Sequence, residues 1–128
     1  MNGRRWKIAA ALTGLVGLCV VAAPAWREAA AQPADARREF EIVARDFAFS
    51  PASIEVQQDA LVRITMRAED IPHSFTIDEY RIAKRAGAGQ AVTFEFRADR
   101  VGTFPFYCNL QLDERCRGMR GQLVVRPR

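Results

Sequence analysis

Short segments in which apolar and polar residues alternate recur along most of this 128-residue chain. Val62, Ile64 and Met66 alternate with arginine and threonine, and residues 92–96 repeat the pattern with valine and phenylalanine. Alternation with a period of two places every second side chain on the same face, which is typical of a strand that buries one side of a sheet. A helical period is suggested only around residues 110–115. The chain is therefore predicted to be all-β.

The spacing of these segments predicts a sandwich of roughly seven short strands. The expected strands cover residues 40–44, 54–56, 62–66, 73–77, 92–96, 102–108 and 122–126. Residues 47–51, which end in a proline, are expected to form a turn. The predicted fold is an antiparallel Greek-key β-sandwich over residues 40–128, preceded by a polar lead-in at residues 32–39. Nothing suggests internal repeats or a second domain.

The first 31 residues have the composition of an export signal. Basic residues precede an uncharged stretch from Ile8 to Trp26, and small residues follow it. This order predicts a signal peptide over residues 1–31, with cleavage after Ala25 or Ala31. The alternative is an uncleaved anchor, because 19 uncharged residues are close to the roughly 20 that span a bilayer. The protein is thus expected to be periplasmic or otherwise exported, and membrane-bound only if the segment stays.

The positive charge of the chain lies mostly in this segment. Removing residues 1–31 takes away four of 19 basic and one of 15 acidic residues, so the net charge falls from +4 to +1. A nearly neutral domain is a poor candidate for binding nucleic acid. The cut also removes Cys19, which leaves two thiols in an oxidising compartment.

Three residue types at the predicted strand ends suggest a metal site. His73 is the only histidine, which excludes centres that need two or more imidazoles from one chain. Cys108 closes a late strand, and Met119 follows in the next loop. Thiolate and thioether ligands favour copper, and imidazole accepts both of its oxidation states. The sequence therefore favours a copper site at one end of the sandwich.

Two segments resemble the cupredoxins, most closely the copper domain of cytochrome oxidase subunit II and of nitrous oxide reductase. They are Asp70-Ile-Pro-His-Ser-Phe75 and the run from Phe96 to Cys108, and the resemblance covers most of residues 40–126. It implies a cupredoxin-like sandwich. In that family the ligand loop carries a cysteine, a second cysteine four residues on, a histidine eight on and a methionine eleven on.

Matching this loop assigns roles to residues of the present chain. His73, Cys108 and Met119 match the first histidine, the first cysteine and the methionine. Leu112 stands in place of the second cysteine, so a binuclear centre is not expected. Cys116 stands in place of the second histidine. The resemblance thus implies one copper per chain held by His73, Cys108, Cys116 and Met119.

Alternatives to this ligand set remain open. In an exported protein Cys108 and Cys116 could instead form a disulfide, which leaves the domain free of metal. Zinc would accept one imidazole and two thiolates, with Asp113 or Glu114 as a further ligand. In the copper reading, three arginines of the same loop would offset the negative charge of two thiolates: Arg115, Arg117 and Arg120.

The expected function is one-electron transfer by a copper protein that is not an enzyme, because no nucleophile or general base stands out. The alternatives are a periplasmic carrier or sensor of reduced copper and a metal-free domain for protein contacts. The expected partner is a redox protein. Basic residues at Arg81, Lys84 and Arg85 would suit an acidic one.

Overall fold

The computed structural model describes residues 37–128. The predicted signal segment at 1–31, Cys19 within it and most of the lead-in at 32–39 lie outside the described residues and stay predictions. The elements in chain order are β1 (Arg37–Arg45), β2 (Ala48–Ser50), β3 (Ser53–Gln57), β4 (Leu61–Ala68), β5 (His73–Ile77), η1 (Asp78–Tyr80), β6 (Ile82–Ala86), β7 (Ala91–Arg97), β8 (Gly102–Tyr107), α1 (Glu114–Gly118) and β9 (Arg120–Arg126). In this range no helix has the length and apolar character to cross a membrane.

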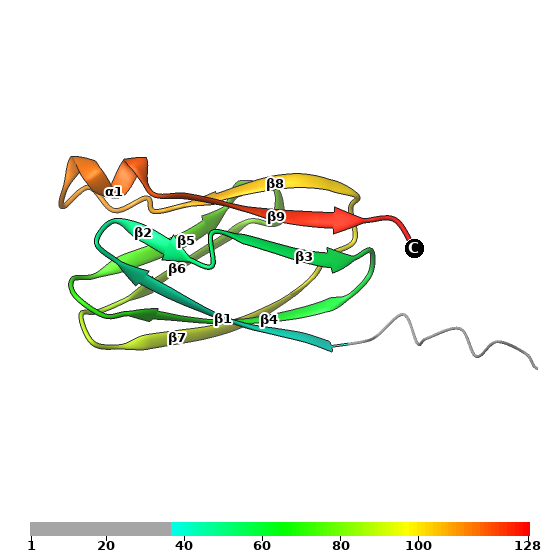
Figure 1. Ribbon diagram of the computed structural model, residues 1–128, viewed down its shortest axis with the longest axis horizontal. Coiled ribbons are helices and arrows are strands. Elements are labelled where there is room, and N and C mark those ends of the chain that lie inside the picture. Colours follow the sequence, from blue (N-terminus) through cyan, green and yellow to red (C-terminus); the bar gives the residue numbers. More distant parts are fainter. Residues whose placement is uncertain (1–36) are drawn as a thin grey trace, which may run out of the picture. The chain divides into compact units, whose positions relative to one another are not determined.

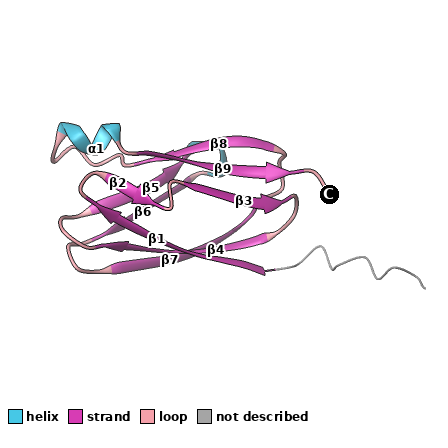
Figure 2. Cartoon of the chain, in the orientation of Figure 1, coloured by secondary structure: helices cyan, strands magenta, loops and turns pink. Residues whose placement is uncertain are grey.

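The strands of the described residues form two sheets packed face to face (Figure 1). One sheet has the order β2-β1-β4-β7, and the other has the order β3-β9-β8-β5-β6. Within residues 37–128 helical structure is limited to η1 and α1, and α1 lies in the connection from β8 to β9 (Figure 2). The predicted all-β sandwich is confirmed.

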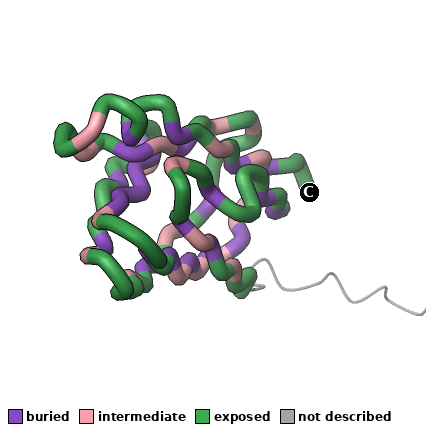
Figure 3. The backbone as a smooth tube through the Cα atoms, turned by 60° about the vertical axis from the view of Figure 1, so that its left-hand side comes forward, coloured by how far each residue is buried: buried purple, intermediate pink, exposed green. Residues whose placement is uncertain are grey.

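The alternation in the sequence matches the burial of the strands. β4 buries Val62, Ile64 and Met66, while Arg63 and Thr65 between them are partly exposed. Buried and more exposed positions also alternate along β3 and β9, whereas all five residues of β5 are buried. Figure 3 shows how buried and exposed stretches are distributed along the chain. The hydrophobic effect therefore fixes which face of each strand turns inward, because a shift of one residue would expose the apolar set.

Aromatic side chains fill the core beneath the second sheet. The rings of Phe75 and Phe106 stack with centroids 4.5 Å apart, and Phe49 meets Phe106 edge-on at 5.2 Å. Gly121 on β9 faces Phe106 so closely that a Cβ atom there would lie 2.1 Å from its ring. Only glycine fits at this position without moving a fully buried ring.

Two strand pairings differ from the antiparallel arrangement predicted from the sequence. β1 pairs with β4 in parallel, and β3 pairs with β9 in parallel. The sequence could not distinguish these cases, because side chains alternate with the same period in parallel and antiparallel strands.

Two short strands were also missed. β2 occupies part of the segment predicted to be a turn. β6 is the edge of its sheet, and its middle residues Ala83, Lys84 and Arg85 are all exposed. An edge strand with charged side chains carries no alternating apolar pattern, although charge at an edge is a common guard against aggregation.

Candidate metal centre

His73 is the first residue of β5, and its side chain is fully buried. Ser74 follows His73 and Asn109 follows Cys108, and two hydrogen bonds join Ser74 to Asn109. The hydroxyl of Ser74 donates to Oδ1 of Asn109 over 2.7 Å, and the backbone N–H of Asn109 donates to Oγ of Ser74 over 2.8 Å. These bonds tie the start of β5 to the end of β8. We call this end of the sandwich, which carries His73, Cys108 and α1, the cysteine end.

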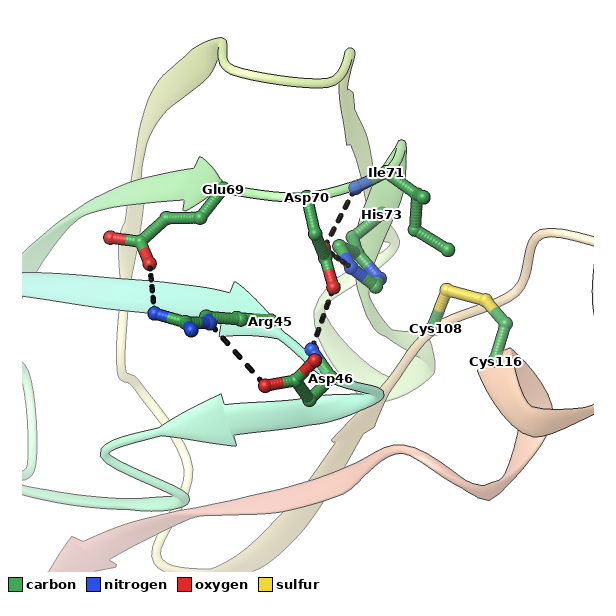
Figure 4. Close-up of polar contacts among 8 residues, drawn as sticks. All are labelled: Arg45, Asp46, Glu69, Asp70, Ile71, His73, Cys108 and Cys116. Atoms are coloured by element: carbon green, nitrogen blue, oxygen red, sulfur yellow. Dashed lines mark hydrogen bonds and ion pairs between the residues drawn. A yellow bond between two sulfur atoms is a disulfide. The ribbon is translucent and has the colours of Figure 1, made fainter.

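Asp70 holds the imidazole of His73 from one side. Its Oδ1 lies 2.7 Å from Nε2 of His73. The same carboxylate accepts hydrogen bonds from the backbone N–H groups of Ile71 and Asp46, each over 2.8 Å. Figure 4 shows Asp70 on one side of the imidazole and the sulfur pair of Cys108 and Cys116 on the other.

The contacts of Asp70 determine which tautomer the neutral imidazole of His73 adopts. Desolvation opposes ionisation, but hydrogen bonds from Asp46, Ile71 and His73 outweigh it and hold the pKa of Asp70 well below its ordinary value. An ionised carboxylate only accepts hydrogen bonds, so Nε2 of His73 donates to it, and in the neutral imidazole the lone pair is on Nδ1. Nδ1 is buried and has no hydrogen-bond partner within residues 37–128. A carboxylate on one nitrogen with the other nitrogen unprotonated is typical of a metal-ligating histidine.

Cys108 and Cys116 form a disulfide, with their Cα atoms 5.3 Å apart. Cys108 follows β8 and Cys116 lies in α1, and both side chains are buried. The disulfide is the alternative that the sequence left open. Both sulfurs are bonded to each other, so the assignment of the two cysteines as copper ligands requires the dithiol form and stays a prediction.

The remaining positions of the loop differ in burial. Met119 directly follows α1, is 1% exposed, and donates its backbone N–H to the carbonyl of Cys116 over 3.1 Å. Leu112, which stands where the resembled family has its second cysteine, is 72% exposed. The structure thus places His73, Cys108 and Cys116 at the cysteine end, with Met119 buried where their loop joins β9, and turns Leu112 toward solvent.

Phe47 covers the imidazole from the adjoining β1–β2 turn. Asp46 and Phe47 form a two-residue turn, and both have positive φ angles of 50° and 59°. Glycine or asparagine usually fills such positions, because a side chain crowds the backbone there. The ring of Phe47 meets His73 edge-on at 6.1 Å, and the guanidinium of Arg115 lies 4.1 Å from the centre of the same ring. The turn therefore contacts both His73 and Arg115 of α1, the helix that contains Cys116.

The carboxylates proposed for zinc have other partners or lie on the surface. Asp113 caps α1 by accepting the backbone N–H of Arg115 over 2.9 Å, and it forms an ion pair with the Arg115 side chain at 2.8 Å. The side-chain hydrogen bond from Arg115 contributes most to lowering the pKa of Asp113 to about 2. Glu114 is exposed on the first turn of α1. Neither supports the zinc alternative.

The donor set decides how well the residues suit copper. Among residues 37–128 no three His, Cys, Asp or Glu side chains are grouped to hold a metal ion. In the disulfide form, His73 and Met119 are the two of the four predicted ligands that keep a free donor atom. The dithiol form would add two thiolates, which gives the soft set that copper prefers. The residues therefore suit copper only after reduction.

Two residues of the site were not predicted from the sequence. The Asp-Ile-Pro-His segment contained Asp70 three residues before His73, a spacing that allows a carboxylate to reach an imidazole, but no role was assigned to it. Phe47 gave no signal, because its contact with His73 joins residues that are far apart in the sequence.

Comparison with known families gives a match over most of the chain. The model of the family described as cupredoxin-like domain matches residues 17–125. A search of curated protein sequences finds no significant match.

Solved structures share the fold. A heme-copper terminal oxidase dimer contains a chain with a TM-score of 0.65 and 21% identity; the match covers 71% of the present chain and 65% of the oxidase chain. Auracyanin A, a "blue" copper protein from Chloroflexus aurantiacus, has a TM-score of 0.60 and 16% identity over 70% of this chain and 98% of its own. The metal-binding domain of the Cu(I)-exporting ATPase CopA of Streptococcus pneumoniae has a TM-score of 0.58 and 18% identity over 70% and 85%. At these identities the likeness establishes the fold.

Proposed function

This chain belongs to the cupredoxin-like domain family, and from that premise we propose that its dithiol form binds one copper ion and works in one-electron transfer. The observation that carries the proposal is the buried, unpaired Nδ1 of His73, fixed by Asp70 opposite the cysteine pair. The proposed ligands are His73, Cys108, Cys116 and Met119. Copper bound there would supply a centre that gains and loses one electron.

The residues around the ligands have roles of their own in this proposal. Asp70 keeps the proton on Nε2 and so leaves Nδ1 free to bind. Phe47 keeps water from the imidazole, because its ring packs edge-on against His73. Nothing in the described residues combines an open pocket with a nucleophile and a base, which favours an electron carrier over an enzyme. The protein is proposed to act outside the cytoplasm, as the N-terminal sequence predicts.

The two cysteines also support two alternative functions for this protein. A carrier of reduced copper is the second candidate, because two thiolates suit Cu(I), and a fold neighbour is a metal-binding domain solved with Cu(I). A metal-free contact domain is the third, because the disulfide removes both thiolates.

The test is copper loading of the reduced domain from residue 32 onward. The proposal expects one copper per chain, and on oxidation an intense thiolate-to-copper absorption band in the visible. The electron-transfer reading expects that band to disappear and return over repeated reduction and oxidation with the copper retained. The carrier reading expects the copper to leave to a chelator instead. If the reduced protein takes up no copper, the metal-free contact domain is the candidate function that remains.

Two variants test the ligand assignment. Cys108→Ser should abolish the visible band, and a band that persists would show the assignment to be wrong. Cys116→His should move the spectrum toward that of a blue site with two histidines, because it restores the family's ligand at this position. An unchanged spectrum would mean that Cys116 does not touch the copper.

A further inference from the structure

A cavity opens beside Cys108, and His73 is not among the residues that line it. Its volume is ≈ 260 Å³, and it is lined by Tyr107, Cys108, Asn109, Gln111, Arg117 and Arg120. Two of these residues carry a permanent positive charge, two carry amide groups, and none is acidic. The lining therefore offers hydrogen-bond donors and positive charge to whatever enters.

The two arginines of the cavity differ from the ion-paired arginines of the described chain. Arg45, Arg63 and Arg126 each have a carboxylate within 3.5 Å. In the described part of the chain, Arg117 has no such partner, and Arg120 only lies over the ring of Tyr107 at 5.1 Å from its centre. Their positive charge is therefore available to an external group, because a guanidinium without an ion-pair partner can donate all of its N–H groups.

No acidic side chain of the described residues lines the cavity. The carboxylate of Asp78 accepts the hydroxyl of Tyr107 over 3.0 Å and lies outside the lining residues. Glu114 is three residues before Arg117 on α1, but the two side chains form no ion pair in the described structure. The positive charge of the cavity is therefore not neutralised from within.

The lining residue Asn109, which we call the floor of the cavity, is held in place by its hydrogen bonds with Ser74 on β5. Ser74 donates to Oδ1 of Asn109, which leaves the amide N–H groups of Asn109 available as donors. Arg85 is the ladder partner of Ser74 on β6 and is exposed, so a third positive charge is carried by the strand next to β5. A fixed floor lowers the entropic cost of binding.

We propose that this cavity receives an acidic side chain of a protein partner and so docks the partner against Cys108. A carboxylate is the expected group, because paired guanidinium forks match its geometry. The proposal deepens the proposed function by placing its acidic redox partner at Arg117 and Arg120, with Arg85 on the nearby strand β6 as a further positive charge. The anion site itself does not depend on copper.

The test uses the full chain in its disulfide form, free of metal, with hexaglutamate as the probe and amide NMR shifts as the readout. Binding should shift the signals of Tyr107, Asn109 and Gln111 and should weaken as salt is added. Replacing both cavity arginines, Arg117→Gln with Arg120→Gln, should weaken binding about tenfold, which corresponds to about 1.4 kcal/mol. The matched control is Arg67→Gln, which removes an exposed arginine from the other sheet and should change binding less than twofold.

Three results would overturn the proposal. Shifts centred on residues outside the cavity would place the site elsewhere. An Arg67→Gln loss as large as that of the cavity variant would mean only a general charge effect. Free glutarate binding as tightly as hexaglutamate would indicate a site for small anions and not for a protein. Because the readout needs no copper, failure here is distinct from failure of copper loading.

Discussion

Oδ1 of Asp70 lies 2.7 Å from Nε2 of His73, and this contact decides which nitrogen of the only imidazole in the chain is left to bind. Two backbone N–H groups hold the carboxylate in place, so its orientation does not depend on His73. In the neutral imidazole the lone pair is then on Nδ1, which is buried and has no hydrogen-bond partner within residues 37–128. It is therefore a prepared donor even in the metal-free protein.

Replacing Asp70 with asparagine should upset this preparation. An asparagine amide can donate as well as accept, so it no longer forces the proton onto Nε2. Nitrogen NMR of the metal-free protein should show the Nε2–H tautomer of His73 almost alone in the wild type and a mixture in Asp70→Asn. A variant spectrum identical to that of the wild type would contradict the role of Asp70.

The same carboxylate should make stability sensitive to acid. The pKa of Asp70 is lowered in the folded state, so below its ordinary value the unfolded chain binds more protons and acid favours unfolding. The contribution is complete above about pH 5 and is lost as the pH falls toward the lowered pKa. Because the side chain is partly exposed, about 1 kcal/mol is expected. Urea unfolding at pH 7 and pH 3 should show Asp70→Asn losing less stability on acidification than the wild type does.

Phe47→Asn should separate stability from protection of the imidazole. Asparagine tolerates the positive φ better, a gain of about 1 kcal/mol, which offsets the loss of a partly buried ring. Diethyl pyrocarbonate should nevertheless modify His73 several-fold faster, because the ring that covers it is gone. Phe104→Ala is the control, since it removes a partly buried ring that contacts Tyr80 instead of His73. Equal rates in the two variants would contradict a covering role for Phe47.

Reduction of the Cys108–Cys116 bond should lower the free energy of unfolding by about 2.5 kcal/mol, because a short loop is released in the unfolded state. Urea unfolding with and without a reductant measures the difference in the metal-free protein. The double variant Cys108→Ala with Cys116→Ala should not respond to the reductant. A wild-type midpoint that ignores the reductant would mean that the bond is absent in solution.

Gly121→Ala should destabilise the core, because its Cβ would lie 2.1 Å from the Phe106 ring and 2.8 Å from the carbonyl of Ala52. Overpacking of this kind costs about 1–3 kcal/mol. Gly118→Ala is the matched control, since a Cβ there meets nothing within 4 Å. Thermal unfolding should show a clear drop for the first variant and little change for the second.

Much of the fold was readable from the sequence because burial imposes a period of two. Val62, Ile64 and Met66 are buried as the pattern predicted. The direction of pairing was not readable, since β1 and β4 would show the same pattern in either orientation. β6 escaped notice because Lys84 and Arg85 occupy an edge that needs no apolar side.

The sequence pointed to residues that the structure brings to one end of the sandwich, and it did not reveal how the two sulfurs are bonded. The structure places His73, Cys108 and Cys116 at one end of the sandwich and buries Met119 at the end of their loop, yet it joins the two sulfurs. No spacing rule tells a thiolate pair from a disulfide eight residues apart, because both need the same short separation. Phe47 reaches His73 only through the turn that follows β1, so only the folded chain reveals that contact.

The parallel pairing of β3 with β9 also has a kinetic consequence. It joins Ser53 to Gln122, which are 69 residues apart, and folds with such distant pairings form in milliseconds to seconds. His73 and Cys108 likewise become neighbours only when β5 meets β8. Cys108 and Cys116, in contrast, are separated by eight residues and can meet in an unfolded chain within about a microsecond. During folding, the two sulfurs can therefore come into contact long before the imidazole of His73 is brought next to them.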